Sequence, residues 1–577
     1  MGRSNDVVNV GYENTENIIV DSGSHTRILI KEEFSFTPKS HHFLGELPKE
    51  NSFTSTSSAS ESDTYDEGKT SASHSVCGLI SLFLAFTACL SGCYIMWATD
   101  IFTQLIHQNL IISNNSMRYE AWKAPPVHAF LRIYIFNYTN VMEFEKGIDS
   151  KLKIQELGPY TYTEKWERVD VKFNENGTAT YRDRKIYRFS PEHSRGQESD
   201  IVVVPNLPFL SALSLIADAP SLVQWSITTL MRFTLAEPFI SLKISDFLWG
   251  YEDRFSVVAQ HLLSMRYDLP FKKFGIMSAK NGTQRDFVTI YTGEEDPSKT
   301  GIVVSYDGKT SLNYWNSAEC NRIDGTDGTI YPPALVHPNS TLYVYSKDLC
   351  RKMPLTYNDE YLDKHGIHVM KFRIPESVFA SGHVQKDNLC FCNHAGRDVK
   401  CLPSGIFNVG PCVFEAPLVT SLPHFLYGDA ILSKGVEGLD PVADKHESFV
   451  EVDPKMGIPV GGKSRLQLNI MLNGEYGIDW RNVIYKDQKV FPVTWMDYGI
   501  DKLPDDVSAT IRSILIFIKV AQFSFSYGFI ICSIVFGILF IHGCCQSLRG
   551  NRYIIRRGRD RKETQSETPL FVISGKR

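Results

Sequence analysis

Two long uncharged apolar runs, one near each end of the chain, constrain its fold more than any other feature. The runs are Val76–Trp97 and Ala521–His542, and neither contains Asp, Glu, Lys or Arg. An α-helix rises about 1.5 Å per residue, so either run spans roughly 33 Å, enough to cross the apolar core of a bilayer. The sequence therefore predicts two transmembrane helices joined by one large segment, residues 98–520.

The charges beside these runs predict the orientation. The basic run Arg549–Lys562 follows the second span, and cytoplasmic flanks are rich in Lys and Arg. With two crossings, both tails, residues 1–75 and 543–577, are expected in the cytoplasm. The segment between the spans is then external. All N-x-S/T glycosylation sequons lie within it, which supports the same orientation independently: Asn114, Asn137, Asn176, Asn281 and Asn339.

The two tails differ in composition. Residues 1–75 are rich in Ser, Thr and acidic side chains and lack an apolar period, so we expect them to be disordered. Residues 543–577 form a basic tail. The whole chain has a net charge of −5, which argues against nucleic acid as the main partner.

The cysteines fall into two groups. Six of the twelve lie between Cys320 and Cys412, a cysteine-rich region in the predicted external segment, where an oxidising environment favours disulfides. A zinc site would need a second pair of closely spaced cysteines or histidines. No such pair accompanies Cys390 and Cys392, so we expect no metal site. These two are also poorly placed to bridge each other, and each is expected to seek a distant partner. Three more are palmitoylation candidates at the cytoplasmic ends of the spans, with plain membrane cysteines as the alternative: Cys77, Cys544 and Cys545.

Short β-like runs broken by Gly, Pro and Asn dominate the external segment. Such runs are residues 128–136, 160–171, 178–188, 287–291, 342–345 and 367–374. Leu207–Trp249 differs, because it is apolar, permissive for helix and punctuated by prolines. It predicts about three short helices, forming either a buried subdomain or an exposed apolar apex.

No catalytic motif is present. The sequence lacks G-x-S-x-G, H-E-x-x-H, a phosphate-binding P-loop and a dinucleotide glycine fingerprint. His446–Glu447 lacks a second histidine, and scattered histidines such as His424 favour structural roles. The chain is therefore not expected to be an enzyme or to need a cofactor.

A series of motifs carries a resemblance to a known family. In order they are WKAPP from Trp122, IYIFNYTN, LGPYTYTE, FLWGYED, CNRIDGTDGTIYPP, DLCRKMPLTY, CFC, CLPSGIFNVGPCVFEAP, SLPHFLYGD and RLQLNIML. Placed between two terminal spans, they resemble the class B scavenger receptors, which include lipid and lipoprotein receptors, lysosomal integral membrane proteins and insect sensory neuron membrane proteins. The resemblance covers about residues 76–545.

The resemblance implies an α+β fold: two terminal transmembrane helices flank a large antiparallel β-barrel-like ectodomain, which has an apical helical bundle at residues 207–249 and a lipid tunnel. It implies the bridges Cys320–Cys390, Cys350–Cys412 and Cys392–Cys401, and it favours palmitoylation. Its members bind lipids or lipid-carrying particles and pass lipid through the tunnel to the membrane. The expected location is the plasma membrane, with an endolysosomal membrane as the alternative. A protein ligand and self-association are further possibilities for partners.

The apical segment departs from family members that attract anionic ligands with lysines. Its only basic residues are Arg232 and Lys243, and Phe233 aligns near the ligand-contacting lysine. These three are our candidates for the ligand entrance. A neutral lipid is then as plausible a cargo as an anionic particle.

Two other classes of function fit the predicted topology. An adhesion, phagocytic or endolysosomal sorting receptor would grip a protein ligand with the ectodomain. A two-span channel subunit also has cytoplasmic tails and a disulfide-rich ectodomain, but the second span lacks an acidic residue for a selectivity ring.

Overall fold

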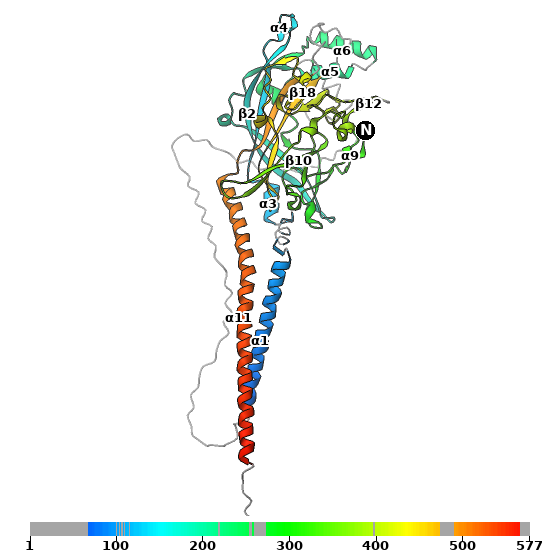
Figure 1. Ribbon diagram of the computed structural model, residues 1–577. Helices are drawn as coiled ribbons and strands as arrows, with labels where there is room; N and C mark the ends of the chain where they lie inside the picture. The colour runs from blue at the N-terminus through cyan, green and yellow to red at the C-terminus, as the bar shows by residue number, and fades with distance from the viewer. Residues whose placement is uncertain are drawn as a thin grey trace, which may run out of the picture. The chain divides into compact units, whose positions relative to one another are not determined.

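The computed structural model describes residues 67–99, 101–102, 104, 108, 110–114, 116–216, 220–252, 255, 257–258, 273–395, 398–472 and 490–565 (Figure 1). Most of the expected disordered tail, residues 1–66, lies outside the described residues, as do residues 566–577.

Two long helices contain the predicted spans. Helix α1 covers Glu67–Ala98, with its apolar stretch at Val76–Ala98, and α11 covers Asp505–Gln565. Helix α11 begins well before the predicted span and continues through the basic run. Pro504 precedes it and no proline interrupts it, so nothing in the sequence ends the helix at the membrane boundary.

Helices α1 and α11 pack against each other in antiparallel directions. The ring of Phe83 lies 5.5 Å from that of Phe540, and Trp97 lies 6.2 Å from Tyr527, measured between ring centroids. Gly92 on α1 lies directly under the ring of Phe529. The absence of a Cβ at this point lets the two helices approach closely.

The ectodomain is built on a large antiparallel, barrel-like sheet. Its main path has the strand order β8-β7-β3-β2-β1-β19-β18-β17-β11-β10-β9. These strands are β1 (Ala129–Tyr138), β2 (Leu152–Asn174), β3 (Thr178–Phe189), β7 (Val288–Tyr291), β8 (Val303–Tyr306), β9 (Thr341–Ser346), β10 (Arg351–Leu362), β11 (His368–Arg373), β17 (Phe449–Asp453), β18 (Ile458–Met471) and β19 (Val490–Ile500). The six predicted strand runs coincide with β1, β2, β3, β7, β9 and β11, which confirms them.

Shorter strands complete the sheets. Branching from the main path are β6 (Gly282–Thr283), β14 (Phe407–Asn408), β15 (Leu418–Ser421) and β16 (Val436–Glu437). Two separate pairs are β4 (Ile201–Pro205) with β5 (Phe239–Lys243), and β12 (Asn393–Ala395) with β13 (Asp398–Lys400). The short helices are α3 (Met117–Lys123), α4 (Val141–Glu145), α5 (Leu207–Ile216), α6 (Ser221–Phe233), α7 (Ile244–Trp249), α9 (Ala318–Asn321) and α10 (Ala443–His446).

The core begins on β1, which lies between β2 and β19. Ile133 faces Tyr160 of β2 on one side and Met496 of β19 on the other. Leu131, Ile133 and Ile135 alternate along β1 and are fully buried, as strand geometry requires of a face turned inward. The same core continues to α5 and α6 through Leu210 and Met231.

The structure refines the expectation for residues 207–249. Three short helices are present, but β5 interrupts them before α7. In β5 Phe239 is buried, Ile240 and Leu242 are half-buried, and Ser241 and Lys243 are exposed. The strand pairs with the valine-rich β4 from Ile201↔Lys243 to Pro205↔Phe239. A strand forms because this partner, far along the chain, satisfies the backbone of Phe239–Lys243.

Three disulfides cross-link the cysteine-rich region. They join Cys320 to Cys390, Cys350 to Cys412 and Cys392 to Cys401, with Cα–Cα distances of 6.5, 6.1 and 4.6 Å. These are the pairs that the resemblance implies, and Cys390 and Cys392 have different partners. Trp315 packs among them, where its indole N–H donates to the carbonyl of Cys350 at 2.8 Å.

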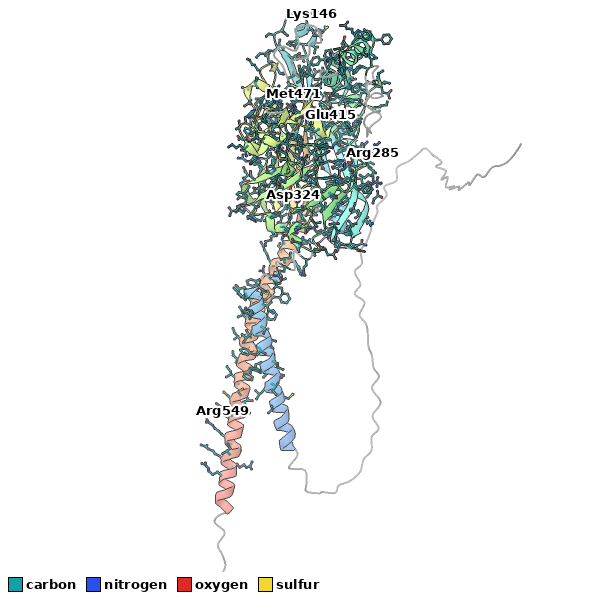
Figure 2. All side chains as sticks on the ribbon, turned by 90° about the vertical axis from the view of Figure 1, so that its right-hand side faces the viewer. Lys146, Arg285, Asp324, Glu415, Met471 and Arg549 are labelled. Carbon is teal, nitrogen blue, oxygen red and sulfur yellow. A yellow bond between two sulfur atoms is a disulfide. The ribbon has the colours of Figure 1, made fainter. Side chains whose placement is uncertain are left out.

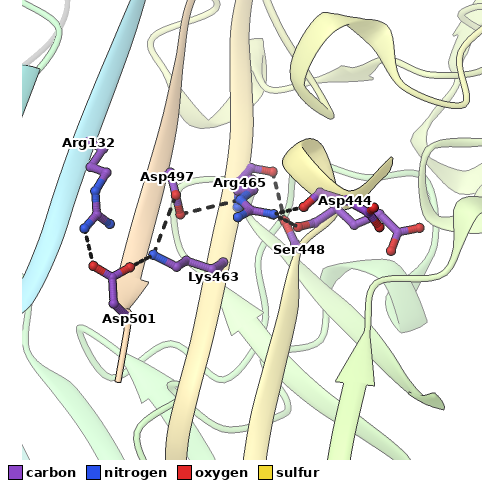
Figure 3. Close-up of polar contacts among 8 residues, drawn as sticks. Arg132, Asp444, Ser448, Lys463, Arg465, Asp497 and Asp501 are labelled. Atoms are coloured by element: carbon purple, nitrogen blue, oxygen red, sulfur yellow. Dashed lines mark hydrogen bonds and ion pairs between the residues drawn. The ribbon is translucent and has the colours of Figure 1, made fainter. Parts of the chain in front are cut away.

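An ion-pair ladder crosses strands β1, β19 and β18 (Figure 3). Asp501 pairs with Arg132 of β1 and with Lys463 of β18. Asp497 of β19 lies 3.7 Å from the Lys463 ammonium and 3.6 Å from Arg465. The ladder ties three neighbouring strands together by their side chains.

Candidate ligand-binding surface

Helix α6 exposes large apolar side chains along one face, which we call the α6 stripe. Leu222, Trp225 and Phe233 are 74%, 67% and 84% exposed. With 3.6 residues per turn, these positions fall on one side of the helix, together with the exposed Thr229. The opposite side carries Met231, which has no exposed surface. The helix is therefore apolar on both its inner and outer faces.

The hydroxyl groups of α6 do not make this surface polar. Ser226, Thr228 and Thr229 each donate to the backbone carbonyl four residues earlier, at 2.6–2.8 Å. Their hydrogen-bonding capacity is thus partly used inside the helix.

The turn after α6 extends the apolar surface. Leu235 is 79% exposed and has a φ of 54°, a left-handed conformation that is costly for leucine. Backbone bonds hold this turn: the N–H of Leu235 donates to Arg232 and that of Ala236 to Met231, both at 3.2 Å. The helix end thus directs a large apolar side chain into solvent.

The structure places the three entrance candidates on two elements. Arg232 and Phe233 are adjacent and exposed at the end of α6. Lys243 is also exposed, but it lies at the end of β5 away from α6, four residues beyond Phe239. At about 3.3 Å per residue along a strand, Lys243 does not share the stripe with Phe233. Of the two basic entrance candidates, only Arg232 therefore borders the stripe.

Strand direction places the α6 stripe at the end of the sheet opposite α11. Strand β19 runs toward α11, and β1, antiparallel to it, runs toward α4. Near the far end of β1, Asn137 accepts a hydrogen bond from Val203 of β4, which leads directly into α5. Helices α4 and α6 lie at this end in Figure 1, and the Lys146 loop lies there in Figure 2. Met142 on α4 and Ile148 in the loop after it are 63% and 72% exposed.

The glycosylation candidates differ in accessibility. Asn114, Asn176, Asn281 and Asn339 are exposed. Asn137 is half-buried within β1, and its side-chain oxygen is 2.8 Å from the backbone N–H of Val203. Glycosylation of all five stays a prediction, and Asn137 is the position where the folded chain leaves least room.

The palmitoylation candidates lie near one end of the helix pair. Gly543, beside Cys544 and Cys545, packs against Leu79, two residues from Cys77. Cys77 and Cys545 are exposed and Cys544 is half-buried, and none of the three is in a disulfide. Acylation at these positions stays a prediction.

The sequence pointed to Phe233 but not to Leu222, Trp225 or Leu235. Their helical spacing is visible in the sequence, where it equally fits a buried face. Only the packing of Met231 on the opposite side decides which face is exposed. The exposed Met142 and Ile148 belong to no periodic apolar pattern in the sequence.

Comparison with known proteins agrees with this architecture. Residues 79–544 match the CD36 family. The chain belongs to the CD36 family. Its similar proteins include scavenger receptor class B member 1 of Sus scrofa, 33% identical over 421 residues, which are 72% of this chain and 79% of that protein. The protein of the same name from Bos taurus is 34% identical over 406 residues, 70% of this chain and 76% of that protein.

The CD36 family also contains more distant relatives of this chain. Lysosome membrane protein 2 of Homo sapiens is 29% identical over 462 residues, which are 77% of this chain and 89% of that protein. The resemblance to the class B scavenger receptors is thereby confirmed. Within the described ranges, no three His, Cys, Asp or Glu side chains are grouped to hold a metal ion.

Proposed function

We propose that this CD36-family membrane protein is a class B scavenger receptor that captures neutral lipids or lipid-carrying particles. Capture occurs on the α6 stripe, and lipid then passes through the ectodomain to the membrane. The proposal rests on the solvent exposure of three large apolar side chains on α6, those of Leu222, Trp225 and Phe233. A soluble surface rarely leaves such a set uncovered without a binding role.

The stripe offers useful but limited binding energy. Fully burying one large apolar side chain contributes about 1.5–3 kcal/mol, so three of them supply several kcal/mol before the costs of association. Such a surface suits a particle or membrane that presents many apolar groups. The sparse charge around it favours neutral cargo over anionic cargo.

Passage through an apolar conduit would spare the lipid most of its exposure to water. That exposure costs about 25 cal/mol per Å² of apolar surface, so transfer can run downhill without a coupled reaction. We place the receptor in the plasma membrane with both tails in the cytoplasm, and an endolysosomal membrane is the alternative site.

Lipid uptake by transfected cells tests this function. Trp225→Glu and Phe233→Glu should each reduce uptake of a fluorescent cholesteryl ester about tenfold per surface molecule, because a carboxylate in the contact must be desolvated. Both side chains are mostly exposed, so surface abundance should remain normal. The matched control is Leu362→Glu, an equally drastic change at a 69% exposed position at the end of β10.

The same assay separates the alternatives. Replacing Phe233 with Lys should improve uptake of an anionic fluorescent fatty acid while reducing that of the ester. Equal uptake by wild type and both Glu variants, at equal surface abundance, would contradict capture by the stripe. Protein binding without any lipid uptake would instead identify a sorting or adhesion receptor, as the similarity to lysosome membrane protein 2 allows.

A further inference from the structure

A buried polar cluster lies apart from the α6 stripe, between two strands and two short helices. Glu156 comes from β2, Trp495 from β19, His424 from a short 3-10 helix (Pro423–Phe425) and His446 from α10. The histidines are 5% and 4% exposed. The Glu156 carboxylate is 2.6 Å from His424 Nε2 and 2.7 Å from the Trp495 indole nitrogen, which donates to it.

The hydrogen bonds define the protonation of both rings. His424 Nδ1 accepts from the backbone N–H of Asp440 at 3.0 Å, and His446 Nδ1 accepts from that of Val442, also at 3.0 Å. A nitrogen that accepts an N–H carries no proton, so each neutral ring bears its proton on Nε2. The His424 Nε2–H then donates to Glu156. The two rings stack with centroids 4.5 Å apart and planes inclined by 14°.

We propose that this cluster is an acid-sensitive latch that holds residues 436–446 against the sheet and releases them when the histidines take up protons. An added proton can bind only at Nδ1, the atom that receives the backbone N–H of Asp440 or Val442. Protonation therefore sets two donors against each other at 3.0 Å and breaks the bond. The bond from Asp440 to His424 ties the segment to the 3-10 helix, and the bond from Val442 to His446 closes the turn before α10 within the segment, so loss of either one loosens residues 440–446.

The charges around the cluster can compensate one imidazolium but not two. Glu156 of β2 is the carboxylate in contact with His424. From β18, Arg465 donates to the backbone carbonyls of Asp444 and Glu447, which places a positive charge beside α10. Lys445 on α10 adds a second positive charge, and Asp497 of β19 lies 3.6 Å from Arg465. Two stacked imidazolium rings would thus repel each other in a partly cationic setting.

The pKa values agree in direction with this geometry. Burial, reinforced by His424, lowers the pKa of His446 from 6.5 to about 4. Burial alone would raise the pKa of Glu156, but the bonds from His424 and Trp495 hold it below its usual value. Both groups therefore bind protons more readily once the segment has opened. Opening is favoured progressively as pH falls from 6.5 toward 4, on the order of tens of fold at pH 4.5 from His446 alone.

The released segment connects to the apical end of the ectodomain. Strand β16, at the start of the segment, pairs in parallel with the first residues of β2, Val436↔Leu152. Those residues follow α4 and the loop after it, which expose Met142 and Ile148. Acid would therefore loosen the support of an apical loop, as a receptor that unloads in an acidic compartment would need.

Hydrogen exchange of the full-length protein in lipid nanodiscs tests the latch at pH 7.0 and 4.5. After correction for intrinsic rates, peptides covering 436–446 should exchange at least tenfold faster at pH 4.5, while β1 and β19 peptides change less than threefold. In the double variant His424→Asn and His446→Asn, the acid response should fall below threefold. The Asn oxygen can accept the same backbone N–H, but it does not titrate.

Two results would overturn the latch. One is a wild-type 436–446 segment that exchanges no faster in acid than the central strands, and the other is a double variant that keeps the full acid response. The wild-type measurement decides the question even where the double variant fails to fold. His383→Asn, at an exposed position, is the matched control and should retain the full response.

Discussion

Arg168 on β2 has a full positive charge and no exposed side-chain surface. Its guanidinium donates to Asp327 at 2.8 Å, to Thr329 at 2.9 Å and to the carbonyl of Trp122. Burial alone would raise the pKa of Asp327, but the Arg168 charge and the bonds from Thr329 hold that pKa below its usual value. This pair joins β2 to the loop before β9.

Removing Arg168 should therefore be costly. Arg168→Leu leaves the Asp327 carboxylate without its counterion, and breaking a buried pair in this way costs about 3–5 kcal/mol. Arg182→Leu is the control, because Arg182 pairs with Asp170 in solvent, where an ion pair contributes about 0–1 kcal/mol. Thermal unfolding of the purified proteins measures both. A similar loss of stability in the two variants would show that the buried pair adds nothing special.

Glycines bring α1 and α11 into close contact, and Gly92 lies at one of these points. A Cβ at Gly92 would lie 2.7 Å from the Phe529 ring, whereas one at Gly78, on the same helix, would meet nothing within 4 Å. We expect Gly92→Leu to separate the helices and reduce the surface abundance of the protein several-fold. Gly78→Leu should leave it unchanged. Flow cytometry of an external epitope measures the difference, and equal abundance would argue against close packing here.

Elements with a strong period could be predicted, and those that depend on distant partners could not. The β-like runs that became β1 and β3, bounded by Gly, Pro or Asn, reveal strands in the sequence itself. Phe239–Lys243 becomes a strand only because β4 pairs with it. In the sequence His424 and His446 look like scattered structural histidines. Nothing in the residues around them shows that the 3-10 helix and α10 bring the two rings together beside Glu156. The outward face of α6 is equally hidden, because an apolar period does not say which side meets the core.

The molecule as a whole has little net charge, −5 over 577 residues, and its proposed capture surface has less still. Exposed charges are screened within about 8–10 Å at physiological salt, so capture that depended on them would weaken as salt rises. We expect uptake of the neutral ester to change less than twofold between about 0.15 and 0.5 M salt. Phe233→Lys should make fatty-acid uptake clearly salt-sensitive. A strong salt dependence in the wild type would point to charged residues away from the α6 stripe.

The pairing of β1 with β19 also governs when the protein can finish folding. Thr494 donates to the carbonyl of Tyr134 across 360 residues of sequence. At about 5–20 residues per second, a ribosome makes β19 roughly 20–70 s after β1. Throughout that interval β1 has one free edge, with unpaired backbone groups ready to join another chain. Quality control in the secretory pathway must guard this edge until the last strand arrives, immediately before the second membrane helix is made.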